Sequence, residues 1–241
     1  MPDWRRRLYD SYVSSGQGGG DSSKGYRSGA PYINQLIQRH IPADRNISIL
    51  DLGCGTGGVI YWLKRAGYEK VSGIDFSPEM VAAAHAAGVN EVRLDSIQAA
   101  LNMTESQCLD VVLVMDVLEH MEREVLFEMC DEIFRVLKPG GRIIAHVPNA
   151  AGIFGASILY GDLTHQLAFT SSSMQQLLHT VGFREVKCYE DKPVTHGLKS
   201  GIRAFLWHAG TVGFRVLHVA ETGTFRGIMS QNLLATAVKT A

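Results

Sequence analysis

Residues 51–58 read Asp-Leu-Gly-Cys-Gly-Thr-Gly-Gly, and this stretch decides how the rest of the chain is interpreted. The apolar residues 47–52, which predict a buried strand, end within this stretch. A predicted helix at residues 57–66 begins within it. Glycines at such a junction let the backbone turn tightly and approach a ligand closely. We therefore expect a ligand-binding loop where the first strand ends.

The same alternation of strand and helix continues beyond this loop. Further strands are predicted at residues 70–76, 91–95, 109–116 and 142–147, and helices at residues 77–87 and 121–137. Ser77, Pro78 and Glu79 form a typical helix start, with a capping hydroxyl, a proline in the first turn and then an acid. Continuous Val/Ile/Leu strands alternating with helices predict a doubly wound α/β fold, with a parallel sheet covered on both faces.

The two ends of the chain are organised differently. Residues 1–45 predict an N-terminal helical segment in which the Gly- and Ser-rich residues 14–28 form a mobile loop and a candidate lid. After residue 147 we expect a long loop over residues 148–170 and then a helix at residues 171–181. Two last strands are expected near residues 183–189 and 233–238.

Composition limits the class of protein. The chain has 241 residues, 46% of them hydrophobic and 20% charged, which is enough for one large domain with its own core. A formal charge of −1 argues against a nucleic-acid or membrane binder that works through bulk charge. The four cysteines form no CxxC pair and the N-terminus shows no export signal, so we expect a cytoplasmic protein.

Three acidic positions indicate which kind of ligand the glycine loop binds. Gly53, Gly55 and Gly58 satisfy GxGxxG, which by itself also fits an NAD-dependent oxidoreductase. Asp51, however, precedes the loop and would repel a pyrophosphate. With Asp75 at the end of the second strand and Asp95-Ser96 at the end of the third, it predicts an acidic pocket for a cationic adenosine ligand, with Phe76 and Met80 as apolar walls.

The chain resembles the class I S-adenosylmethionine-dependent methyltransferases through DLGCGTGG, GIDFSPEM, RLDS, LDVVLVMDVLEHM and LKPGG, in that order, over residues 46–190. The resemblance implies a Rossmann-like, mostly parallel seven-stranded sheet with an antiparallel last strand beside the fifth, an N-terminal helical segment, a methyltransferase domain over residues 46–241 and a C-terminal helical insertion. A non-catalytic cofactor-binding protein is the other alternative. The implied cofactor-binding residues are Asp51, Gly53, Cys54, Gly55, Asp75, Phe76, Met80, Asp95, Ser96 and Met115.

A second set of polar residues follows the fourth strand. The Asn/Asp-Pro-Pro-aromatic motif that resembling enzymes use for amide or base nitrogens is absent there, which disfavours nucleic-acid bases as acceptors. Asp116, Glu119 and His120 instead stand at positions i, i+3 and i+4, and His165 lies in a later loop that could fold over the same edge. These four residues predict a divalent-cation site that would activate an acceptor hydroxyl.

The pattern is similar to the ubiquinone-biosynthesis O-methyltransferases and, more distantly, to small-RNA 2'-O-methyltransferases, which implies a cation such as Mg²⁺; Asp116 replaces the first Glu. Without a metal, His165 or His120 would act as a lone catalytic base. A loop similar to that of sugar-modifying methyltransferases favours a sugar or glycan hydroxyl as the acceptor. A phenol or quinone precursor is the alternative, because a phenol ionises near pH ~10 and needs less activation.

Residues 197–223 predict an inserted amphipathic helix, broken near residues 210–213. Its apolar stripe would pack on the sheet or a second subunit in a homodimer, or rest on a membrane surface as a peripheral contact, in which case Trp207 should be exposed. The stripe consists of Leu198, Ile202, Phe205, Leu206, Ala209, Val212, Val216 and Leu217, with Lys199, Arg203 and Arg215 outside it.

Overall fold

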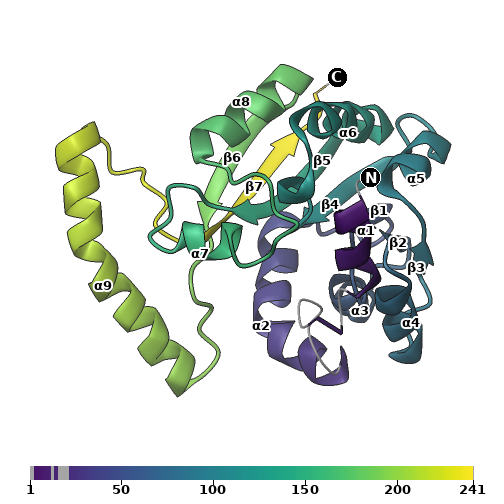
Figure 1. Cartoon of the computed structure of the whole chain (residues 1–241), viewed down its shortest axis with the longest axis horizontal. Coiled ribbons are helices and arrows are strands. Elements are labelled where there is room, and N and C mark those ends of the chain that lie inside the picture. Colours follow the sequence, from purple (N-terminus) through teal and green to yellow (C-terminus); the bar gives the residue numbers. More distant parts are fainter. Residues whose placement is uncertain (1–2, 12–13, 16–21, 241) are drawn as a thin grey trace.

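A seven-stranded sheet forms the centre of the protein (Figure 1). The computed structural model describes residues 3–11, 14–15 and 22–240. The strands lie in the order β3-β2-β1-β4-β5-β7-β6, which confirms the predicted doubly wound, mostly parallel fold. They are β1 (Ile49–Leu52), β2 (Val71–Asp75), β3 (Val92–Leu94), β4 (Leu109–Met115), β5 (Leu137–Pro148), β6 (Arg184–Glu190) and β7 (Asn232–Val238).

The central strands are apolar because both faces of the sheet are covered. In β4 the four residues Val111 to Val114 are fully buried, and they pair in parallel with β1 on one side and β5 on the other. The strand β7 runs antiparallel to β5, with Ala145 opposite Ala235, as expected for the last strand. The carboxyl ends of β1, β2 and β4 therefore meet at one edge.

Helices cover the two faces with separate cores. One core joins the sheet to α5, α6 and α8, and the other joins it to α2, α3 and α4 (Figure 1). The helices are α1 (Asp3–Asp10), α2 (Ser22–His40), α3 (Gly58–Arg65), α4 (Pro78–Ala86), α5 (Ile97–Met103), η1 (Leu118–His120), α6 (Arg123–Val136), α7 (Gly155–Leu159), α8 (Ser171–Val181) and α9 (Leu198–Thr222).

The expected start of α4 is confirmed. Ser77 is the N-cap and its hydroxyl accepts a hydrogen bond from the Met80 amide, while Pro78 occupies the first turn. The cap fixes the point where the chain leaves β2, and so it fixes the position of Asp75 at the edge of the sheet.

Several local predictions were wrong. α2 begins at Ser22, inside the expected loop, because the later part of the same helix buries Leu36 and Ile37 and stabilises it. Residues 16–21 of the expected loop lie outside the described part. The expected loop after β5 contains α7, and α5 had no clear periodic signal. α9 runs unbroken through Gly210 and Gly213, since about 1 kcal/mol per glycine does not interrupt a helix of 25 residues.

β5 begins at Leu137, before the expected start of this strand at residue 142, and Leu137 pairs with Leu109 across an irregularity in the register. Among the described residues, no helix combines the length and the apolar character needed to cross a membrane.

Candidate active site

The loop between β1 and α3 is held against the end of β2. The amides of Gly53 and Cys54 donate to the carbonyl of Ile74, at 2.8 and 3.0 Å. Gly53 has a φ of +69° and faces Val117: a Cβ built on it would lie 2.4 Å from the Val117 Cγ2 atom. Only glycine combines this backbone conformation with such a close approach.

Asp75 ties this loop to the start of α4. One carboxylate oxygen accepts from the Gly55 amide at 2.7 Å and the other from the Ser77 amide at 2.8 Å. Burial raises the pKa of this carboxyl, although the backbone donors Ser77 and Gly55 oppose the shift. The side chain is thus fixed in place before any ligand arrives.

A cavity of about 640 Å³ opens beside these residues, at the carboxyl ends of the neighbouring strands β1 and β4. The strand that follows β1 and the strand that follows β4 lie on opposite sides of this pair, which is the usual place for a ligand in such a sheet. Its size suits a nucleoside-sized ligand together with part of a second molecule. It is lined by Arg5, Tyr9, Gly53, Gly55, Asp75, Phe76, Ser77, Met80, Ser96, Ile97, Gln98, Met115, Asp116, Val117, His120, Met121, Glu122, Val125 and Met129.

Most of the predicted cofactor-binding residues line this cavity, and three do not. Asp51, Cys54 and Asp95 are absent from its wall. Asp51 is 1% exposed, and burial followed by the charge of Asp75 raises the pKa of its carboxyl to about 8. Asp95 instead accepts from the Ser96 amide at 2.8 Å, at the start of α5.

The N-terminal helix α1 contributes to the cavity from a distant part of the chain. Arg5 donates to the carbonyl of His120 at 2.6 Å, and the ring of Tyr9 packs edge-on against Phe76 with centroids 5.2 Å apart. These contacts place α1 over the cavity, where it forms part of the wall.

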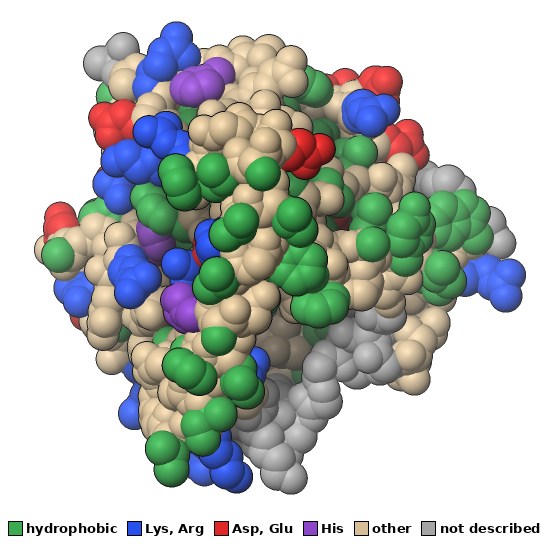
Figure 2. All heavy atoms as spheres, turned by 90° about the vertical axis from the view of Figure 1, so that its left-hand side faces the viewer, with side chains coloured by type: hydrophobic (Ala, Val, Ile, Leu, Met, Phe, Trp, Pro, Cys, Tyr) green, Lys and Arg blue, Asp and Glu red, His purple; other side chains and the backbone are tan. Residues whose placement is uncertain are grey.

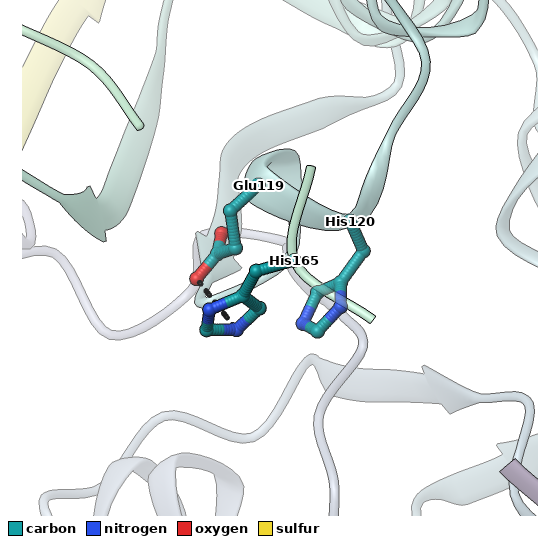
Figure 3. A group of neighbouring side chains, drawn as sticks. All are labelled: Glu119, His120 and His165. Carbon is teal, nitrogen blue, oxygen red and sulfur yellow. Dashed lines mark ion pairs between the residues drawn. The ribbon is translucent and has the colours of Figure 1, made fainter. Parts of the chain in front are cut away.

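Glu119, His120 and His165 come together next to the cavity (Figure 3). One candidate ligand atom from each lies within 4.8 Å of the others, and the Glu119 Oε1 to His165 Nε2 distance is 4.0 Å. Glu119 and His120 come from η1, while His165 comes from the loop after α7, which is anchored to η1 by amides donated to the Glu119 carbonyl. The loop expected to fold over this edge therefore does so.

Hydrogen bonds to the two imidazoles indicate which ring nitrogens are free of protons. His165 Nδ1 lies 3.0 Å from the carbonyl of Ile158, which can only accept, so Nδ1 carries the proton. His120 Nδ1 lies 2.8 Å from the hydroxyl of Thr164, which itself donates to Asp162 at 2.6 Å. Both rings, when neutral, therefore present an Nε2 lone pair.

Glu119 is an unusual residue at this position. Its side chain is 1% exposed, and neither carboxylate oxygen has a hydrogen-bond partner among the described residues. Burial, followed by the charge of Asp116, raises its pKa to about 8. Burial and the neighbouring His165 lower the pKa of His120 to about 4. A buried carboxyl group facing two imidazoles has the donor chemistry of a cation site, and a bound cation would favour the ionised form of Glu119.

Asp116 lies apart from this group. Its carboxylate lies 2.6 Å from Nδ1 of His146 in β5, and His146 Nε2 lies 3.3 Å from Asp191. Burial alone would lower the pKa of His146, but the two carboxylates raise it to about 10, so the ring is an imidazolium at neutral pH. Asp116 also has a φ of +56°, an uncommon conformation for a side chain with a Cβ.

Comparison with known proteins agrees with this geometry. Residues 49–141 match the family model described as "Methyltransferase domain". The chain is 31% identical over 200 residues to a malonyl-[acyl-carrier protein] O-methyltransferase from Herminiimonas arsenicoxydans, covering 81% of this chain and 74% of that protein. The chain belongs to the class I S-adenosylmethionine-dependent O-methyltransferases.

One further relative of this methyltransferase supports the assignment, and one solved structure shares its fold. A ubiquinone biosynthesis O-methyltransferase from Methylobacterium nodulans is 33% identical over 150 residues, which cover 55% of this chain and 58% of the relative, less than two thirds of its length. The crystal structure of a SAM-dependent methyltransferase from Archaeoglobus fulgidus shares the fold, with a TM-score of 0.64 at 22% identity over 86% of this chain and 93% of that one. The alternatives of an oxidoreductase and of a non-catalytic protein are thereby set aside.

Sequence reasoning missed several residues of the methyltransferase cavity. Arg5 and Tyr9 carry no local signal, because only the tertiary structure brings α1 to this edge. Met121, Val125 and Met129 recur every four residues, and this helical spacing could have identified a common face. Asp191, which contacts His146 outside the cavity wall, was missed because the two residues are 45 positions apart in the sequence.

Proposed function

We propose that this enzyme transfers the methyl group of S-adenosylmethionine to a phenolic hydroxyl of a small molecule, of the quinone-precursor type. The observation that carries the proposal is the position of His120, which lines the cavity and presents an unprotonated Nε2 beside Glu119 and His165. Ubiquinone biosynthesis O-methyltransferases are among the relatives, and their name supports this acceptor class.

The cofactor is proposed to lie along the loop of Gly53 and Gly55, with its ribose hydroxyls near Asp75. The base would lie between Phe76 and Met80 and turn its exocyclic amine toward Ser96 and Asp95. Phe76 supports this placement because it is 40% exposed at the cavity, an open apolar surface for the base. Asp51, below the floor, would act through its charge rather than by contact.

The remaining wall favours an aromatic acceptor over a sugar. Met121, Val125 and Met129 add apolar surface to the wall of the cavity, and thioethers pack well against aromatic rings. A sugar ring would leave its hydroxyls without partners along this wall. The relatives described above are not named for sugar substrates either, so the phenol replaces the glycan as the proposed acceptor.

The proposed reaction is an in-line displacement. With no cation bound, His120 Nε2 takes the proton of the acceptor hydroxyl as the oxygen forms a bond to the methyl carbon and the bond between that carbon and sulfur breaks. S-adenosylhomocysteine would leave as a neutral thioether, and the His120 imidazolium would hold the positive charge. The enzyme aligns the two reactants and removes the proton, since the cofactor itself supplies the reactivity.

A divalent cation fits the cluster of Glu119, His120 and His165. When bound, it would occupy the Nε2 lone pair of His120 and lower the pKa of an acceptor hydroxyl, and so would replace His120 as the means of activating that hydroxyl. Two imidazoles with one carboxylate favour Mn²⁺, Fe²⁺ or Zn²⁺ over the expected Mg²⁺, which prefers oxygen ligands. Asp116 was the fourth predicted ligand, but its carboxylate contacts His146 and it is not part of the cluster. Because Asp116 also lines the cavity, its proposed role is to face the acceptor.

The function is tested by transfer of labelled methyl groups to a panel of catechols, hydroquinones and sugars. We expect turnover on the phenols, and a loss of 10²-fold or more in kcat for His120→Asn, with S-adenosylhomocysteine binding retained in calorimetry. His196→Asn, at an exposed histidine, is the matched control. Transfer to sugars alone would exclude the phenolic acceptor, and unchanged kcat in His120→Asn would exclude the base.

The metal is tested by calorimetric titration with Mn²⁺ and Zn²⁺, and by activity in excess EDTA. We expect one site that is lost in His165→Ala, with EDTA removing activity that Mn²⁺ or Zn²⁺ restores. S-adenosylhomocysteine binding should stay the same, because His165 does not line the cavity. Full activity in EDTA, or equal metal affinity in the variant, would leave His120 as a base without a metal.

A further inference from the structure

The helix α9 turns its large apolar side chains away from the protein. It stands apart from the sheet at the end of two connecting segments (Figure 1), and the residues that face inward, Ser200, Ala204 and Thr211, are small or polar. Core-facing helices show the opposite arrangement. Seven large apolar residues are between 53% and 84% exposed: Leu198, Ile202, Phe205, Leu206, Val212, Val216 and Leu217.

These seven side chains form one continuous stripe. At 100° per residue they fall within an arc of about 140°. The other residues within this arc are Ala209, Gly213 and Ala220, and Lys199 lies at its edge. The stripe therefore contains no charged side chain in its interior. The space-filling view of this side shows hydrophobic side chains along the helix with Lys and Arg side chains beside them (Figure 2).

The charge around the stripe is positive. Residues 192–226 carry five lysines and arginines against one acid, Glu221, for a formal charge of +4 in a chain whose total is −1. Arg215 is held by Glu190 at 2.7 Å. Lys199, Arg203 and Arg226 form no ion pair with any residue that the structure describes, so their charges are free to meet an anionic partner.

We propose that the outward face of α9 docks on an anionic lipid bilayer. The helix would lie in the plane of the interface, with its stripe toward the acyl chains and Lys199, Arg203 and Arg226 among the headgroups. Packing against α9 of a second copy would instead bring two segments of charge +4 together.

Trp207 was expected to be exposed if the helix contacts a membrane, and it is half-buried. The exposed aromatic side chain within the stripe is Phe205, at 70% exposure.

The experiment is flotation of the 241-residue chain with phosphatidylcholine vesicles, with and without phosphatidylglycerol. We expect binding to the anionic vesicles and its loss in high salt. Phe205→Asp should weaken binding at least tenfold, because it places a charge in the apolar stripe. Lys199→Gln and Arg203→Gln should each weaken it about fivefold.

Met103→Asp is the matched control, since Met103 is 80% exposed on another helix and its variant should bind like the wild type. Each variant is first checked for an unchanged melting temperature and unchanged S-adenosylhomocysteine affinity. Failure to float with anionic vesicles, or equal flotation of Phe205→Asp, would overturn the proposal. Light scattering that shows a dimer broken by Phe205→Asp would assign the stripe to a second copy instead.

Discussion

At the scale of single residues, the acidic side chains of Asp51 and Asp75 determine the charge next to the cofactor cavity. Asp51 is fully enclosed, and its Oδ1 atom has no hydrogen-bond partner among the described residues. Its pKa of about 8 means that the free protein holds a proton there near neutral pH. Bound S-adenosylmethionine, a cation, would favour the ionised form and release that proton.

This residue predicts a pH dependence of stability. Because the folded state binds the Asp51 proton and the unfolded state has lost it above pH ~4, the free energy of unfolding should fall as the pH rises from ~4 to about 8, by up to ~1.4 kcal/mol per pH unit. Urea denaturation at several pH values measures it. Asp51→Asn should flatten this dependence relative to Asp131→Asn, at an exposed acid. Equal slopes in both variants would refute the assignment.

At the scale of elements, the β1–α3 loop works because two of its glycines are required for different reasons. Gly53 and Gly55 both have positive φ, of +69° and +55°. A Cβ on Gly53 would meet Val117, whereas a Cβ on Gly55 would have nothing within 4 Å. The first glycine is needed for space and conformation, and the second for conformation alone.

We therefore expect unequal effects of two equal substitutions. Gly55→Ala should cost about 1–2 kcal/mol of stability through backbone strain. Gly53→Ala should cost a further ~1–3 kcal/mol through overpacking, and should weaken S-adenosylhomocysteine binding because Val117 lines the cavity. Thermal denaturation and calorimetry measure both effects. Val117→Ala should partly rescue Gly53→Ala but not Gly55→Ala, and the absence of rescue would show that the contact is unimportant.

At the scale of the whole molecule, part of the cavity wall comes from α1, near the start of the sequence. Arg5 and His120 are separated by 115 residues, yet the Arg5 guanidinium donates to the His120 carbonyl and lies 3.9 Å from Glu122. Arg5 is 9% exposed, so this contact fixes α1 over the cavity. Cofactor exchange should require its release.

Arg5→Ala should therefore speed the dissociation of S-adenosylhomocysteine by roughly tenfold, since a hydrogen bond from a charged group contributes about 1.5–3 kcal/mol. Stopped-flow fluorescence with a displacing ligand measures this rate. Arg7→Ala is the control, because Arg7 lies exposed on the same helix. Equal dissociation rates in the two variants would show that α1 does not limit release.

Much of the architecture could be predicted from local patterns. The apolar runs of β1 and β4, the cap at Ser77 and the glycine loop each depend on neighbours in sequence, so periodicity and turn chemistry identified them. The prediction was weaker where local propensity is ambiguous: α5 is short, and α2 begins in a Gly- and Ser-rich stretch. Tertiary packing decides such segments.

The sequence by itself determined the alternating strands and helices, the cofactor loop with Asp75, and the group of Glu119, His120 and His165. Each of these depends on short spacings in the sequence or on loops that leave one edge of the sheet. Only the tertiary structure decided that Asp116 faces His146, that α1 lines the cavity, and that the stripe of α9 points outward. These are contacts between distant segments, and a helical stripe fixes which residues share a face but not which way that face turns.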